Sequence, residues 1–85
     1  MTGVRDKAIQ GVYIVDTSGS PLMMRSEPST TGTVMAQLKT KTEVISIGFR
    51  SDKWYDVIAI IDGVLYQGFC HSDYLTKKEE LNTWT

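Results

Sequence analysis

Short apolar runs separated by polar turn residues make up most of this chain. The longest run, Val57–Ile61, is almost unbroken, and such a run predicts a strand that is covered on both faces. The dipeptide Asp62-Gly63 follows this run and favours the positive backbone angles of a two-residue hairpin turn. The strand that begins near Trp54 should therefore pair antiparallel with the strand that ends at Cys70.

The rest of the chain repeats this alternation of strands and turns. Turn residues recur about every eight to twelve positions, a spacing typical of a small all-β barrel. Gly11, Gly48 and Gly68 fall inside predicted strands, where a glycine allows the sheet to bend. No helical pattern precedes Lys77, and the segment from there on could begin a turn of helix. The predicted fold class is therefore all-β, a small barrel of five to six short antiparallel strands, with candidate strands at 8–15, 22–25, 33–38, 43–49, 54–61 and 64–70.

Composition and charge bound the class of protein. A chain of 85 residues has room for one domain, and 41% hydrophobic with 22% charged residues is an ordinary globular composition. The net charge of −1 comes without a basic block or stripe, so we expect no nucleic-acid partner. No segment approaches the length needed to span a bilayer, so no membrane partner is expected, and residues 2–10 lack the apolar core of a signal peptide.

The ordered domain is expected between residues 8 and 76. Residues 1–7 are predicted to be an N-terminal linker stub, and residues 77–85 a C-terminal tail or linker. Such ends favour a domain cut from a longer chain. The compartment stays open: extracellular or cell-wall associated within a longer secreted chain, and cytoplasmic otherwise. We expect the isolated domain to be a monomer.

The neighbouring Cys70 and His71 raise the question of a cysteine nucleophile. Consecutive side chains on a strand point to opposite faces, whereas a nucleophile and its base must come within hydrogen-bond reach. No other pairing exists, because the chain has one cysteine and one histidine. We therefore expect Cys70 to be a small buried residue and His71 to lie in a turn near solvent. Two adjacent ligands do not make a zinc site, and we expect no catalytic residue, metal or cofactor.

Six segments, in this order, resemble the family of bacterial Src-homology-3-like domains. Two of them are the segment with Gly32, Val34, Met35 and Leu38, which is similar to a valine pair followed by a leucine in that family, and the strand that opens at Thr42 and Val44. Leu22–Ser29, LMMRSEPS, resembles that family's LNVRSGPS signature, and Trp54–Val57 is similar to its WYKV strand. Gly68–Cys70 stands where the family usually has GWV, and Ser72–Leu75 resembles its closing SSYL. The resemblance covers roughly Ile9–Leu75. It implies a barrel of five to six strands without catalytic activity, found beside cell-wall hydrolases of bacteria and their phages, where some members bind peptidoglycan peptides.

The chain departs from that family's pattern at several positions. Met23 replaces the usual asparagine, Glu27 the usual glycine and Phe69 the usual tryptophan. Met23 and Phe69 bear on any ligand surface, so these departures concern the identity of the ligand more than the fold.

The eight aromatic residues predict a recognition surface. A small barrel is filled by mid-sized side chains, so some aromatic rings should lie outside, where they make good anchors. Trp54 and Tyr55 lie on opposite faces by parity, and the sequence leaves open which one points inward. The expected interior side chains are Val34, Leu38, Val44, Val57, Ala59 and Cys70. The predicted ligand-binding residues are Tyr13, Trp54, Phe69 and Tyr74, with Asp52 at the rim and Arg25 as an anion contact.

Alternatives remain for these residues and for the function. Trp54 and Tyr74 could simply plug the ends of the barrel, and Arg25 could hold a loop carbonyl or Glu27. The first hypothesis is a non-catalytic module that targets a parent cell-wall hydrolase or surface protein to peptidoglycan peptides through an aromatic groove. The alternative is a structural or protein–protein interaction domain that packs on a partner domain or binds an extended peptide. Partial exposure of Val57–Ile61 would favour that alternative.

Overall fold

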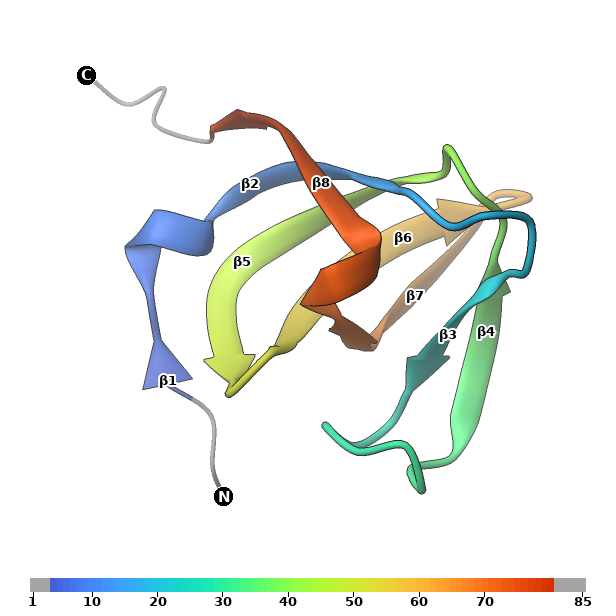
Figure 1. Cartoon of the computed structure of the whole chain (residues 1–85), viewed down its shortest axis with the longest axis horizontal. Coiled ribbons are helices and arrows are strands. Elements are labelled where there is room, and N and C mark those ends of the chain that lie inside the picture. Colours follow the sequence, from blue (N-terminus) through green and yellow to red (C-terminus); the bar gives the residue numbers. More distant parts are fainter. Residues whose placement is uncertain (1–3, 81–85) are drawn as a thin grey trace.

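The computed structural model describes residues 4–80 of the chain, which form one curled antiparallel sheet (Figure 1). The described part contains no α-helix, and its two single-turn 3-10 helices are neither long nor apolar enough to cross a membrane. The elements are β1 (Val4–Arg5), η1 (Lys7–Ile9), β2 (Gly11–Val15), β3 (Leu22–Arg25), β4 (Val34–Leu38), β5 (Glu43–Ser51), β6 (Trp54–Ile61), β7 (Val64–His71), η2 (Ser72–Tyr74) and β8 (Leu75–Glu80).

The strands follow the order β4-β3-β7-β6-β5-β2-β8, and β1 pairs with the far half of β5. The all-β prediction is confirmed, with every strand pair antiparallel. The structure has eight strands where five or six were expected, because short segments at both ends also join the sheet. β8 pairs along the whole of β2, so residues 77–80 form a strand and no turn of helix begins there. The sheet therefore extends past the predicted boundaries at residues 8 and 76.

The sheet bends within β5. The register between β5 and β6 shifts between Ser46 and Arg50, and Gly48 lies at this point with a φ of 95°. Residues with a Cβ atom rarely adopt a φ of this sign, so the glycine allows the strand to bend there. The first half of β5 pairs with β2 and the second half with β1, as Figure 1 shows. The predicted bend at Gly48 is confirmed.

Gly68 has a different role from the predicted one. A Cβ atom at this position would lie 2.7 Å from Met24 Cγ and 2.8 Å from the Arg25 carbonyl oxygen. The glycine therefore allows β3 to approach β7 closely, and this contact joins the β3–β4 hairpin to the rest of the sheet.

The core lies on the concave side of the sheet. Tyr13 was expected at the surface, and this prediction is wrong: it is 6% exposed, and its hydroxyl donates to the Ile9 carbonyl at 2.8 Å. Val34 was expected inside, but it is 43% exposed because it lies near the open end of the edge strand β4. The other expected interior residues are buried, and the core comprises Tyr13, Val15, Leu22, Met24, Leu38, Val44, Val57, Ala59 and Cys70.

The β6–β7 hairpin turns at Asp62-Gly63 as predicted, and both residues have positive φ values of 52° and 81°. The prediction that Val57–Ile61 is covered on both faces is wrong. Val57 and Ala59 are buried, whereas Ile60 is 67% exposed. The reason is that a single curled layer buries only its inner face, so alternate residues of the run face outward.

Candidate functional site

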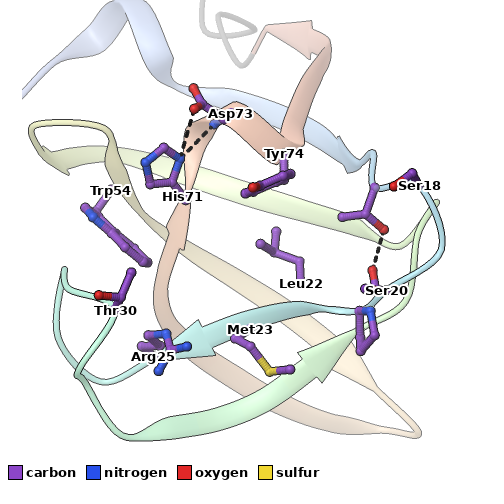
Figure 2. Close-up of a pocket in the computed structure, with 12 residues that line it drawn as sticks. Ser18, Ser20, Leu22, Met23, Arg25, Thr30, Trp54, His71, Asp73 and Tyr74 are labelled. Atoms are coloured by element: carbon purple, nitrogen blue, oxygen red, sulfur yellow. Dashed lines mark hydrogen bonds and ion pairs between the residues drawn. The ribbon is translucent and has the colours of Figure 1, made fainter.

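An open groove of about 580 Å³ lies beside the junction of β3 and β7. One wall comes from the start of β6, the end of β7 and η2. The other comes from the loop at residues 17–21 and from β3, with Thr30 of the following loop at the edge (Figure 2). These segments are far apart in the sequence, and the strand pairing brings them together. We call this site the aromatic groove.

Three rings form the first wall of the aromatic groove. Trp54 and His71 are directly opposed on β6 and β7, and their ring centroids are 5.1 Å apart at an interplanar angle of 82°. Tyr74 follows on η2, with its ring centroid 6.0 Å from that of His71. The rings stand in a row along the wall in Figure 2. Tyr74 is 48% exposed, so it offers its surface to a ligand.

His71 fixes the turn that carries Tyr74. Its Nδ1 accepts a hydrogen bond from the Asp73 backbone N–H at 3.2 Å, which caps the 3-10 turn. Because Nδ1 is the acceptor, the proton of the neutral ring is assigned to Nε2. The backbone N–H of Ser72 also donates to the Lys53 carbonyl at 2.7 Å, which ties η2 to the β5–β6 turn. The sequence did not single out His71 for a ligand site, although its place in a predicted turn next to Tyr74 was a signal.

The floor and second wall come from β3. Leu22 is buried at the base, Met23 and Arg25 line the side, and Met24 between them points into the core. Arg25 Nη1 donates to the Gly32 carbonyl at 2.9 Å, so the expected bond to a loop carbonyl is confirmed. Arg25 also lies at the groove, where Figure 2 shows it below Trp54.

Hydroxyl groups and the Pro21 ring line the far end of the aromatic groove. Ser18 and Ser20 lie there, and Thr17 Oγ1 donates to the Ser20 carbonyl at 2.5 Å, which closes the loop on itself. This end is polar and exposed, whereas the Trp54 end is aromatic. An elongated ligand would therefore meet rings at one end and hydroxyl groups at the other.

The structure brings together half of the predicted ligand-binding residues. Trp54, Tyr74 and Arg25 line the aromatic groove, whereas Tyr13 lies in the core. The other two lie outside it. Phe69 is half buried on β7, opposite Asp56 and Arg25. Asp52 is exposed in the β5–β6 turn, where its carbonyl accepts from Arg50 Nη1 at 3.3 Å.

The open question of Trp54 and Tyr55 is settled by their contacts. Tyr55 packs on the core, and its ring lies edge-on to Tyr13 with centroids 5.7 Å apart. Trp54 points the other way, into the aromatic groove. The parity argument was correct, and the direction of the curl decides which ring is inside.

The thiol and imidazole of the Cys70-His71 pair do not face one another. Cys70 is fully buried in the core, and its burial raises the pKa of the thiol from 9.0 to about 12. His71 faces the aromatic groove from the opposite side of the strand. A thiol in that setting is a poor nucleophile, because the reactive form is the thiolate. Among residues 4–80, no three His, Cys, Asp or Glu side chains gather in a way that could hold a metal ion.

Comparison with protein-family models, with curated proteins and with solved structures found no match for this chain.

Proposed function

We propose that this chain is a non-catalytic binding module of the bacterial Src-homology-3-like type. In this proposal it targets a parent cell-wall hydrolase or surface protein to peptidoglycan peptides through the aromatic groove. One observation carries the proposal: three of the segments that resemble the family meet at this groove. Leu22–Ser29 contributes Leu22, Met23 and Arg25, Trp54–Val57 contributes Trp54, and Ser72–Leu75 contributes Asp73 and Tyr74.

The shape and chemistry of the groove support a peptide ligand. Trp54 and Tyr74 offer flat apolar surfaces with a polar edge, which suit side chains and peptide planes. The nearby hydroxyl groups of Ser18 and Ser20 suit the polar backbone of such a ligand. The groove is open and offers few desolvated anchors, so we expect a modest affinity.

The test is a chemical-shift titration of the isotope-labelled chain with purified soluble cell-wall fragments. We expect perturbed resonances at Trp54, His71 and Tyr74, and none at the buried Tyr13. The Trp54→Ala variant should lose the response, and the Ile60→Ser variant, changed on the outer face of the sheet, should keep it. Unchanged resonances at all three groove rings at millimolar fragment would contradict the proposal.

A second candidate function, a protein–protein interaction domain, is favoured by one observation on the outer face of the sheet. Val12, Ile45 and Ile58 lie in register across β2, β5 and β6. Ile60 and Leu65 are paired on the β6–β7 hairpin and are 67% and 61% exposed. We call these five residues the isoleucine face. Ile45, Ile60 and Leu65 are exposed, and Val12 and Ile58 are partly exposed beside them. Apolar side chains gathered on one exposed face mark interaction sites in soluble proteins.

The two candidate functions differ in the surface that the bound partner would cover. Relaxation of methyl resonances by a neutral soluble nitroxide reports which side chains meet solvent. A partner domain bound through the isoleucine face should protect the Ile60 and Leu65 methyl groups and leave Trp54 accessible. A bound partner that leaves both methyl groups as accessible as in the free chain would contradict the second candidate.

A further inference from the structure

Arg25 is held at the aromatic groove by a single loop contact. Its side chain is partly buried, and Nη1 donates to the Gly32 carbonyl at 2.9 Å. Gly32 is itself packed tightly, since a Cβ atom there would lie 3.0 Å from the Glu27 carbonyl oxygen. The guanidinium is therefore positioned by a compact loop before any ligand arrives, which lowers the ordering cost of binding.

No protein carboxylate neutralises this guanidinium in the described part of the chain. The ion pairs found between described side chains include Arg50 with Asp6, Lys78 with Glu43 and, when the ring is protonated, His71 with Asp73, and none of these involves Arg25. Asp73 belongs to the groove but lies across it from Arg25, beyond His71, as Figure 2 shows. Arg25 thus brings to the groove a positive charge that has no ion-pair partner among residues 4–78.

A guanidinium in this state suits a carboxylate. It has five N–H donors in a rigid fork, and the contact with Gly32 uses one nitrogen. Charge-assisted hydrogen bonds from such a fork are stronger than neutral ones and can be bidentate. The neighbouring Thr30 could supply a hydroxyl group at the same end. A ligand segment without an anion would leave the charge of Arg25 partly desolvated and unpaired.

We infer that the aromatic groove recognises a carboxylate-bearing peptide, with the carboxylate on Arg25 and an apolar group of the ligand against Trp54 and Tyr74. This inference rests on the proposed peptide-binding function and narrows its ligand class. Among cell-wall peptides it favours an acidic stem over an uncharged bridge made of glycine. The carboxylate is either a chain terminus or a side chain, since both present the same pair of oxygens.

The experiment compares matched synthetic peptides on the unmodified chain, followed by chemical-shift titration. The probes are a stem tetrapeptide with all carboxylates free, the same peptide amidated at its C-terminus, the same peptide amidated at its side-chain carboxyl, and pentaglycine amide. We expect one of the two amidations to weaken binding by roughly tenfold, the size of a lost charge-assisted hydrogen bond. The amidation that does so identifies the source of the carboxylate.

Two substitutions locate the contact. Arg25→Gln removes the charge and keeps an N–H donor. This variant should bind the free-acid and amidated peptides equally, and it should bind the free-acid peptide roughly tenfold more weakly than the unmodified chain does. Arg25→Lys keeps the charge without the fork and should retain part of the preference. Lys39→Gln, an exposed charge outside the groove, should leave the preference intact. Amide spectra of each variant report whether it is folded.

The outcomes separate this inference from the proposed function. Equal binding of all four probes at the groove rings would overturn the carboxylate inference and leave the peptide-binding function standing. Tighter binding of pentaglycine amide than of the free-acid stem would overturn it as well. No binding by any probe would overturn both. Because the peptide comparison uses the unmodified chain, the result stands even if Arg25→Gln fails to fold.

Discussion

The Trp54 and His71 rings meet edge to face across the β6–β7 pair, with centroids 5.1 Å apart and ring planes inclined at 82°. This contact joins the wall of the aromatic groove to the strand that carries the buried Cys70. The groove is therefore built on paired strands at this end, which hold side chains more firmly than a loop does.

Substitution of the neighbouring residues Trp54 and Tyr55 should separate binding from stability. Trp54→Ala should weaken peptide binding by roughly tenfold or more, since an anchoring ring is lost, and cost about 1 kcal/mol or less of stability. Tyr55→Ala should cost about 2–4 kcal/mol, because its ring packs on Tyr13 and the core. Chemical denaturation and peptide titration measure the two effects. A larger loss of stability in Trp54→Ala than in Tyr55→Ala would show that Trp54 is a core residue.

The Gly68→Ala substitution should loosen the β3–β4 hairpin. The new methyl group would collide with Met24 Cγ at 2.7 Å and the Arg25 carbonyl at 2.8 Å, so we expect a loss of about 1–3 kcal/mol. Leu65→Ala, on the same strand but 61% exposed, is the control and should cost about 0.5 kcal/mol or less. Amide hydrogen exchange should speed up in β3 and β4 before it does in β5 and β6. A variant as stable as the unmodified chain would refute the close approach.

The Cys70 thiol should make stability fall at alkaline pH. Its pKa is about 12 in the folded chain against 9.0 for an ordinary thiol, so the unfolded chain releases the proton first as the pH rises. The protonated thiol therefore contributes its full stability below pH 9.0. Between pH 9.0 and about pH 12 this contribution is lost, and the free energy of unfolding falls by at most about 1.4 kcal/mol per pH unit. Cys70→Val should lack this component. Denaturation midpoints of both proteins between these pH values make the comparison.

The same burial predicts that Cys70 reacts with thiol reagents only when the structure opens. Labelling by iodoacetamide at pH 8 should be slow in buffer and should accelerate in urea together with unfolding. Rapid labelling of the native chain would mean that the β7 end of the core is accessible.

The ionisation of Asp56 and that of Asp6 should change the stability of the fold in opposite directions. Partial burial raises the pKa of Asp56, so its ionisation weakens the fold as the pH rises through that pKa, and Asp56→Asn should be neutral or stabilising at pH 7. The hydrogen bonds from Arg50 and the Ala8 N–H lower the pKa of Asp6. The ionised Asp6 therefore stabilises the fold at neutral pH, and this stabilisation is lost as the pH falls through the pKa that Asp6 has in the folded chain. Asp6→Asn should therefore destabilise the β1–β5 pairing. Carboxyl carbon shifts across pH 2–7 give both directions, and the same direction for both residues would contradict the assignment.

The positions of the strands and turns could be predicted well from local sequence, whereas the buried side of each strand was predicted less well. Asp62-Gly63 specified its hairpin because only a few residues tolerate the turn, and Gly48 specified its bend for the same reason. Tyr13 was misplaced because residues 11–15 contain no charged or strongly polar side chain that would mark the solvent face, so alternation could not show which face is buried. Val34 was misplaced because a strand's position at the sheet edge is a property of the topology, which its own sequence does not encode.

The aromatic groove was harder to predict than the strands that build it. Trp54 and Tyr74 could be nominated as aromatic rings that a small barrel has no room to bury, and Arg25 as a charge at the end of a short apolar segment. His71 was not nominated, although it lies in a predicted turn close to Tyr74. Its role depends on the residue across the strand pair and on the hydrogen bond that it accepts from the Asp73 N–H. Phe69 and Asp52 were nominated for their residue type. Phe69 pairs with Asp56, farther along β7 from the groove than His71, and Asp52 lies in the β5–β6 turn, so neither lines the groove.

Because the two walls of the aromatic groove come from early and late segments of the chain, the groove exists only after β3, β6 and η2 have docked together. The unfolded chain offers no such site, so any occupant must shift the folding equilibrium toward the native state. A ligand present at a hundred times its Kd adds about 2.7 kcal/mol, which for a domain of this size raises Tm by roughly 10 °C or more. The proposed occupant can therefore be tested without any labelled partner: heating the chain with a library of small cell-wall fragments should raise Tm only for fragments that bind the native chain.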